Sequence, residues 1–167
     1  AAVRSDPYNV GGGSATGTDA VAIGESAVAT GDYSTAFGVS SNASNNGSIA
    51  IGNSAISSAG RAMALGPESS SVGENAIAIG SSSLGSKSNS ISLGTSANSS
   101  GNGSTGIGAN AISSNSDSIA IGSNSNSSGV NSIAIGTTSI ATANNSVAIG
   151  AGSVANISNQ VSIGTVN

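Results

Sequence analysis

The sequence predicts an all-β fold, a parallel β-roll built from 14-residue coils. Three observations lead to this prediction. A glycine recurs at a fixed interval without an insertion, a short segment that alternates large and small side chains precedes it, and a polar segment closes each period. A fixed period of this kind indicates structural units that stack on their neighbours. The eleven glycines are Gly24, Gly38, Gly52, Gly66, Gly80, Gly94, Gly108, Gly122, Gly136, Gly150 and Gly164.

The segment before each glycine predicts the first strand of the coil. It reads IAIG at 49–52 and 77–80, and ISLG at 91–94. Large aliphatic residues at alternate positions have the period of a strand, and β-branched residues favour strands. The glycine ends the strand, because glycine adopts a bend or a positive φ at little cost.

A second, shorter strand is predicted three to five residues after each glycine. Ala55-Ile56-Ser57 and Ala111-Ile112-Ser113 are examples, and their flanking residues are almost always Ala or Ser. The central residue alternates along the chain between apolar and polar, and we interpret it as an outward position. A turn follows, as at Asn45-Asn46-Gly47, built from residues that tolerate tight turns. The central residues are Val28, Asn42, Ile56, Ser70, Leu84, Asn98, Ile112 and Asn126.

Two strands that face each other across a narrow coil leave no room for two rows of bulky side chains. The sequence-based hypothesis therefore places the large residues of the first strand inside the roll, opposite small residues such as Ala55 and Ser57. The predicted core is Ile23, Phe37, Ile49, Ile51, Leu65, Ile77, Ile79, Ile91, Leu93, Ile107, Ile119, Ile121, Ile133, Ile135, Val147, Ile149 and Ile163.

The small residue at the centre of the first strand then points outward. Two buried aliphatic residues per coil return less free energy than ordering the whole coil costs, so we expect a second buried surface. We predict that the outward alanines pack against partner chains; the alternative is that alanine merely fills the strand. The predicted interface is Ala22, Ala36, Ala50, Ala64, Ala78, Ala120, Ala134 and Ala148.

Composition limits the possible functions and partners. The chain has 167 residues, a formal charge of −4, 6% charged residues and neither cysteine nor histidine. Nucleic-acid binding needs a basic patch, which three scattered cations do not form. Residues 1–18, which include Pro7, follow no repeat and are predicted to be an N-terminal cap or irregular lead-in. Residues 19–167 are predicted to form a roll of about ten coils, with no segment that contacts a membrane.

Enzymatic chemistry is not expected from these residues. Serine is abundant, but without histidine or cysteine, and with Lys87 as the single lysine, nothing is placed to activate a nucleophile. The seven carboxylates are scattered, so no metal or cofactor site is expected. The GxGxxG match at 101–106 lies inside the strand repeat, whereas a dinucleotide site needs a helix after it.

The hexapeptides NSVAIG at 145–150, NSIAIG at 131–136 and DSIAIG at 117–122 closely resemble the head repeats of trimeric autotransporter adhesins of the YadA family. The resemblance extends over about residues 19–164. It implies a left-handed parallel β-roll, three chains side by side, and display on the surface of a Gram-negative bacterium as the head of an outer-membrane-anchored protein. It also implies attachment to collagen, fibronectin, laminin or host cells, and of bacteria to one another. The heptad stalk and membrane anchor of such adhesins are not in this sequence, which would be a head fragment.

Ligand contacts of an adhesin head would lie at exposed turns or outward strand positions. Tyr33, Arg61 and Lys87 are the least repetitive residues there and are the candidates. Two other functions stay open. An ice-binding solenoid would need a regular threonine ladder, and a spacer of a surface or phage fibre would need no ligand at all.

Overall fold

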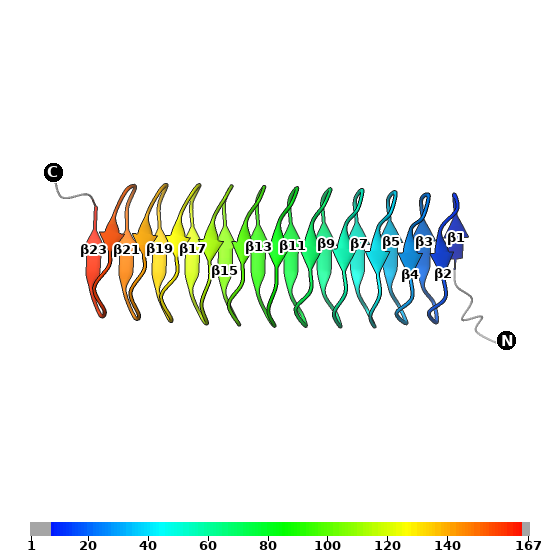
Figure 1. Cartoon of the computed structure of the whole chain (residues 1–167), viewed down its shortest axis with the longest axis horizontal. Helices are drawn as coiled ribbons and strands as arrows, with labels where there is room; N and C mark the ends of the chain where they lie inside the picture. The colour runs from blue at the N-terminus through cyan, green and yellow to red at the C-terminus, as the bar shows by residue number, and fades with distance from the viewer. Residues whose placement is uncertain (1–7, 165–167) are drawn as a thin grey trace.

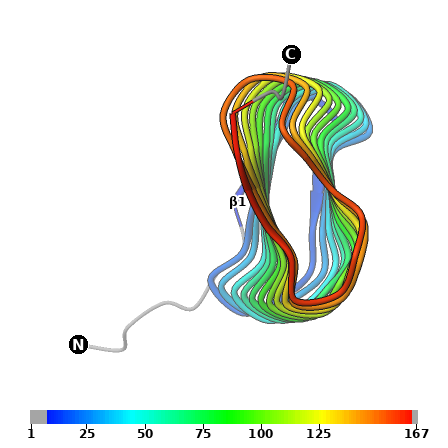
Figure 2. The same cartoon turned by 90° about the vertical axis from the view of Figure 1, so that its left-hand side faces the viewer.

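The computed structural model describes residues 8–164, and these form a rod of stacked coils (Figure 1). Each coil contributes one strand to each of two parallel sheets, and viewed down the rod the sheets are the two opposite walls of a flattened loop (Figure 2). Every strand pairs in parallel with the equivalent strand of the next coil. This architecture confirms the predicted all-β parallel solenoid of 14-residue coils. No helix able to cross a membrane occurs within residues 8–164.

The first sheet has 12 strands of three residues and the second sheet has 11 strands of two residues. The first sheet consists of β1 (Tyr8–Val10), β3 (Val21–Ile23), β5 (Thr35–Phe37), β7 (Ile49–Ile51), β9 (Met63–Leu65), β11 (Ile77–Ile79), β13 (Ile91–Leu93), β15 (Thr105–Ile107), β17 (Ile119–Ile121), β19 (Ile133–Ile135), β21 (Val147–Ile149) and β23 (Val161–Ile163). The second sheet consists of β2 (Ser14–Ala15), β4 (Val28–Ala29), β6 (Asn42–Ala43), β8 (Ile56–Ser57), β10 (Ser70–Ser71), β12 (Leu84–Gly85), β14 (Asn98–Ser99), β16 (Ile112–Ser113), β18 (Asn126–Ser127), β20 (Ile140–Ala141) and β22 (Val154–Ala155).

The roll begins earlier than the predicted boundary at residue 19. Strand β1 pairs with β3, with Tyr8 opposite Val21, and β2 pairs with β4, with Ser14 opposite Val28. Residues 8–18 therefore form the first coil rather than an irregular lead-in. The predicted cap also included residues 1–7, which lie outside the described residues.

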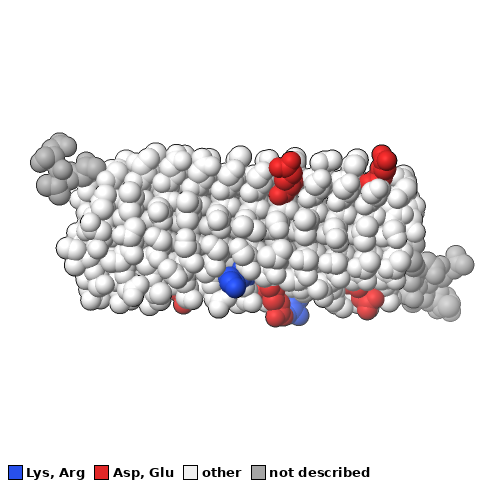
Figure 3. Space-filling model, in the orientation of Figure 1, with Lys and Arg blue, Asp and Glu red and all other residues white. Residues whose placement is uncertain are grey.

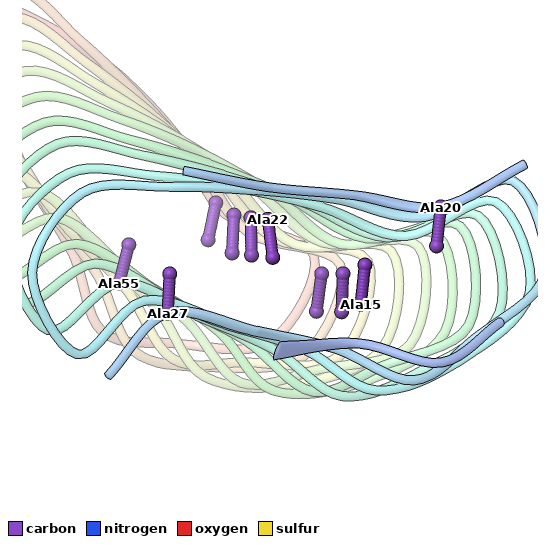
Figure 4. Close-up of a cluster of buried hydrophobic side chains, with 10 residues drawn as sticks. Ala15, Ala20, Ala22, Ala27 and Ala55 are labelled. Carbon is purple, nitrogen blue, oxygen red and sulfur yellow. The ribbon is translucent and has the colours of Figure 1, made fainter. Parts of the chain in front are cut away.

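The interior of the roll contains only small side chains. In one representative coil Ala50, Ala55, Ser57 and Ala62 point inward and are at most 1% exposed. Across the described residues every buried apolar side chain is alanine and every buried polar side chain is serine. Figure 4 shows alanines from both walls directed into the space between them. Each coil thus places about four small side chains in a thin core.

The prediction that the large apolar residues form this core is wrong. They occupy the two outward positions of each first-sheet strand, where Phe37 is 50% exposed and Leu65 is 38% exposed. None of the predicted core residues is buried: they are Ile23, Phe37, Ile49, Ile51, Leu65, Ile77, Ile79, Ile91, Leu93, Ile107, Ile119, Ile121, Ile133, Ile135, Val147, Ile149 and Ile163.

The predicted alanine interface is wrong for the same reason. All eight alanines lie at the inward, central position of their strands and are 0% exposed within a single chain, so no partner chain can contact them: Ala22, Ala36, Ala50, Ala64, Ala78, Ala120, Ala134 and Ala148.

The distance between the walls explains the inversion. Gly106 occupies the inward position of β15, and a Cβ added there would lie 2.9 Å from Oγ of Ser99 and 3.4 Å from Oγ of Ser113 on the opposite wall. A single methyl group already fills the gap. Both walls must therefore present small residues inward, and the large residues are left on the outside.

The buried serine hydroxyls form hydrogen bonds inside the roll. Oγ of Ser34 donates to the carbonyl of Gly31 at 2.6 Å, and Oγ of Ser104 donates to the carbonyl of Gly101 at 2.8 Å. The same bond to the carbonyl three residues earlier recurs at Ser69 and Ser139. Serine is thus as small as the core requires, and at these positions the adjacent turn satisfies its hydroxyl. Among the buried serines of residues 8–164, Oγ of Ser90 has no hydrogen-bond partner.

The recurring glycine is required by backbone geometry and by close approach. Gly52 has a φ of 136°, a region that side chains disfavour, and a Cβ there would lie 2.5 Å from the carbonyl oxygen of Gly66 in the next coil. The same contact repeats from coil to coil along the rod. The 14-residue glycine period is therefore the period of coil stacking.

Candidate functional site

The outward side of the first sheet is a continuous apolar face. We call the two outward positions of these strands the apolar face; Ile77 and Ile79 of β11 are examples. The strands pair in register, with Ile77 opposite Ile91 and Ile79 opposite Leu93. Apolar residues, most of them aliphatic, therefore align in two rows, interrupted in the upstream row by Thr35 and Thr105. Tyr8 and Phe37 are the aromatic members. Soluble monomers seldom expose an apolar surface of this continuity.

The outward side of the second sheet has one row, because its strands have one outward residue each. We call this the alternating row. Its members pair in register from coil to coil, for example Leu84 with Asn98 and Asn98 with Ile112. The predicted outward position is confirmed, since Ile56 is 41% exposed and Ile112 is 38% exposed. The row is Ser14, Val28, Asn42, Ile56, Ser70, Leu84, Asn98, Ile112, Asn126, Ile140 and Val154.

Charged side chains lie in the turns and not on the sheets. Among the described residues, Glu25 and Glu68 lie in the turn that follows the recurring glycine, and all other charges lie in the turn that follows the second strand: Asp19, Asp32, Arg61, Glu74, Lys87 and Asp117. Figure 3 shows the coloured side chains along the two long edges of the rod, with an uncharged broad face between them. Both sheets therefore present neutral surfaces to a partner.

The three predicted ligand contacts, Tyr33, Arg61 and Lys87, share one edge of the rod. Tyr33 is 61% exposed. Arg61 occupies the equivalent turn position two coils later, with φ values of 59° and 56° for the two residues. The Arg61 guanidinium donates to a carboxylate oxygen of Glu74 and to Oδ1 of Asn75, both at 2.8 Å. Arg61 is thus engaged with its own chain.

Lys87 lies beside a hollow of about 210 Å³. Gly101 is part of its lining. A Cβ added to Gly101 would lie 2.0 Å from the carbonyl oxygen of Asn115, so no side chain fits at this position. The Asn115 amide donates to the carbonyl of Ser128 in the following coil. The remaining lining residues are Ser100, Asn102, Ser114 and Ser116. The hollow offers hydroxyls, amides and one ammonium group.

Acidic side chains do not gather at any one place. Within residues 8–164 no three carboxylate side chains lie close enough to hold a metal ion. The GxGxxG match leads into strand β15 instead of a helix, so it does not form a dinucleotide site. The surface is composed of aliphatic, hydroxyl and amide groups in long rows, which suits contact with an extended partner.

Comparisons with known proteins identify the repeat. A family model described as the YadA head domain repeat (2 copies) matches residues 15–39, 29–55, 57–83, 86–111, 99–125 and 127–153, well over half of the chain. Among solved structures, the collagen-binding domain of the Yersinia adhesin YadA is similar, with 26% sequence identity over 95% of this chain and 70% of that chain, and a TM-score of 0.46. No curated protein matched the sequence.

Proposed function

The chain belongs to the family of YadA head domain repeats, and on that premise we propose that it is the adhesive head of a bacterial surface protein. It would be exposed outside the cell on an outer-membrane-anchored fibre. Its role would be to attach bacteria to extracellular-matrix proteins such as collagen, fibronectin or laminin, to host cells, or to one another, without an enzymatic step. The observation that carries the proposal is the family repeat itself, which continues over nearly the whole rod.

The working form in this proposal is a homotrimer joined through the apolar face. Two rows of mostly aliphatic side chains run the length of the first sheet, whose 12 strands are separated by steps of about 4.8 Å, so the rows are about 53 Å long. Water contact along such rows is unfavourable, and a second and third copy can cover them. The number three comes from the family resemblance. Trivalency would multiply weak contacts along each roll.

The test is solid-phase binding of the purified trimer to collagen, fibronectin and laminin, with attachment to cultured cells as a fourth arm. We expect saturable binding to at least one matrix protein and loss of that binding after heat denaturation. A folded trimer that binds no matrix protein, no cell and no second head would instead be a structural spacer.

The ice-binding alternative receives no support from the outward rows. Ice-binding faces need threonines at regular spacing, and the apolar face contains threonine only at Thr35 and Thr105 among its described strands. Thermal hysteresis at micromolar protein concentration would contradict the adhesin proposal.

A further inference from the structure

The hollow beside Lys87 brings together polar side chains from the turns of three consecutive coils. The first coil contributes Lys87, the second residues 100–102 and the third residues 114–116. The three serines of this lining are half-buried, whereas Lys87 and the two asparagines are exposed. We call these residues together the Lys87 hollow. Its hydroxyls are therefore less accessible to solvent than the longer side chains of the same lining.

The arrangement around Gly101 is specific to this place on the rod. Lys87 and Asn115 occupy the same turn position one coil before and one coil after Gly101. They are two coil steps apart, about 9.6 Å along the rod, and Gly101 has no side chain that could extend between them. Of the glycines at this position, Gly101 is the one that has a long polar side chain in both neighbouring coils. The other glycines at this position within residues 8–164 are Gly17, Gly31, Gly73 and Gly129.

The size of the Lys87 hollow limits its ligand to a small molecule or to one unit of a larger one. Its volume is about 210 Å³, which corresponds to about seven water molecules of about 30 Å³ each. Sites for drug-sized ligands usually have about 300 Å³ or more. The lining has no aromatic and no branched aliphatic side chain, so a ligand must be held by hydrogen bonds and charge. A single pyranose ring with its substituents is of this size and kind.

The charge of the Lys87 hollow comes from Lys87 alone. The ion pair among residues 8–164 joins Arg61 to Glu74 and leaves the Lys87 ammonium group without a carboxylate partner. Asp117 is not part of the lining; its Oδ1 lies 2.7 Å from the position that a Cβ on Gly103 would take. One ammonium group matches a ligand with a single negative charge, and its hydrogen bond to a carboxylate is stronger than a bond between neutral groups.

The other groups of the lining are suited to a ligand with several hydroxyls. A serine hydroxyl both donates and accepts, and an asparagine amide has two donors and one acceptor. The Asn115 amide nitrogen donates to the carbonyl of Ser128, which holds that side chain in one orientation. Sugar hydroxyls also donate and accept, so neighbouring hydroxyls of one ring can pair with neighbouring groups of this lining.

We propose that the Lys87 hollow binds one pyranose ring that carries a carboxylate, as uronic acids and sialic acids do. The Lys87 ammonium group donates to the carboxylate, and the serines and asparagines form hydrogen bonds with the ring hydroxyls. This inference rests on the proposed adhesive function, because acidic sugars occur on the glycans of host cells and of the extracellular matrix. A single shallow site binds weakly, and the copies of the site in the proposed homotrimer add up through multivalency.

The test compares four small ligands in a titration of the folded head, followed by the backbone amide NMR signals of Gly101 and Asn115. Methyl glucuronide and the methyl glycoside of N-acetylneuraminic acid represent the two sources of a carboxylated ring. Methyl glucoside has the ring without the carboxylate, and acetate has the carboxylate without the ring. The four ligands therefore separate the contribution of the charge from that of the hydroxyls.

Four variants test the residues of the hollow. Lys87→Gln removes the ammonium group, and Lys87→Arg keeps the positive charge. Asn102→Asp adds a carboxylate that competes with the ligand for Lys87. Its matched control, Asn46→Asp, adds the same group at an exposed, equivalent turn position four coils earlier. Circular dichroism establishes that all variants fold like the wild type.

We expect at least one acidic sugar to bind about fivefold or more tightly than methyl glucoside and acetate, a factor in the range of an exposed ion pair. Lys87→Gln and Asn102→Asp should each weaken that binding by about fivefold, whereas Lys87→Arg and Asn46→Asp should change it by less than about twofold. The inference would be overturned if neither acidic sugar bound, if methyl glucoside or acetate bound as tightly, or if Asn46→Asp weakened binding as much as Asn102→Asp.

The adhesive function is measured separately on the same preparations, as attachment to matrix proteins and cells. Attachment without binding of either acidic sugar would contradict this inference and leave the adhesive function standing. Binding of an acidic sugar in the hollow without attachment to any matrix protein or cell would support the site and contradict the adhesive function.

Discussion

The two walls of the roll share one inner surface but have different outer surfaces. Inward, both walls present Ala, Ser and occasionally Gly in every coil after the first, where Asn9 is opposite Ala22. Outward, the first sheet presents two rows of aliphatic residues in nearly every coil, and the second presents a single row that alternates. The inner surfaces are the same because the walls are too close for anything larger. The outer surfaces are free to differ, so the rod has one continuous apolar face and one face on which polar and apolar residues alternate.

Substitutions at inward positions of either wall should have the largest effect on the stability of the roll. Ala134→Leu in β19 and Ala141→Leu in β20 each add bulk where both alanines are 0% exposed. We expect each to lower the free energy of unfolding by about 3 kcal/mol or more, since the core has no room to accept it. Thermal unfolding followed by circular dichroism measures the loss.

The control for the inner surface is Ile133→Leu at an outward position of β19, which should cost less than about 1.5 kcal/mol. If one wall tolerates leucine and the other does not, the two inner surfaces are not equally restricted to small residues.

The outer surfaces are distinguished by a pair of triple variants. Ile79→Ser/Ile107→Ser/Ile135→Ser removes three aliphatic side chains from the apolar face, and each is worth about 1.5 kcal/mol or more when buried. We expect the assembled head to dissociate, with the association constant reduced well over a hundredfold in sedimentation equilibrium.

The matched set, Ile56→Ser/Leu84→Ser/Ile112→Ser, removes three aliphatic residues from the alternating row. It should leave the solution mass unchanged. A head that stays assembled with the first set and dissociates with the second would place the interface between copies on the other sheet.

The close stacking of coils should be sensitive at one glycine and insensitive at another. Gly94 has a φ of 137°, and a Cβ there would lie 2.6 Å from the carbonyl oxygen of Gly108. A Cβ added to Gly60 would have no other atom within 4 Å. We expect Gly94→Ala to cost about 2–3 kcal/mol and Gly60→Ala less than about 0.5 kcal/mol in urea unfolding. Similar costs would mean that coil spacing adjusts more easily than the contacts indicate.

The charged edges should contribute least to stability. Arg61 and Glu74 form an ion pair at 2.8 Å, with side chains 67% and 60% exposed. Arg61→Gln should cost less than about 1 kcal/mol, because exposed pairs are screened by solvent. The difference from the wild type should shrink further at high salt concentration. A larger loss that persists in salt would show that the edge stabilises the roll in a way that ion pairing does not explain.

The positions of the site residues could be predicted from the sequence, but their contacts could not. The outward position of Ile56, Asn98 and their equivalents followed from the flanking Ala and Ser residues. The placement of Arg61 in a turn followed from the repeat, but its pairing with Glu74 did not, because that contact joins turns of successive coils through flexible side chains. The hollow beside Lys87 depends on how closely Gly101 approaches Asn115, which a linear pattern does not report.

The sequence by itself determined the coil length, the strand and turn positions and the fact that each strand has one large and one small face. Only the tertiary structure decided which face is inside. Alternation along a strand is symmetric in this respect, so Ile49 and Ile51 inward with Ala50 outward fits the pattern as well as the reverse. The separation of the walls removes the symmetry, since one methyl group from Ala50 fills the gap and two isoleucines cannot enter it.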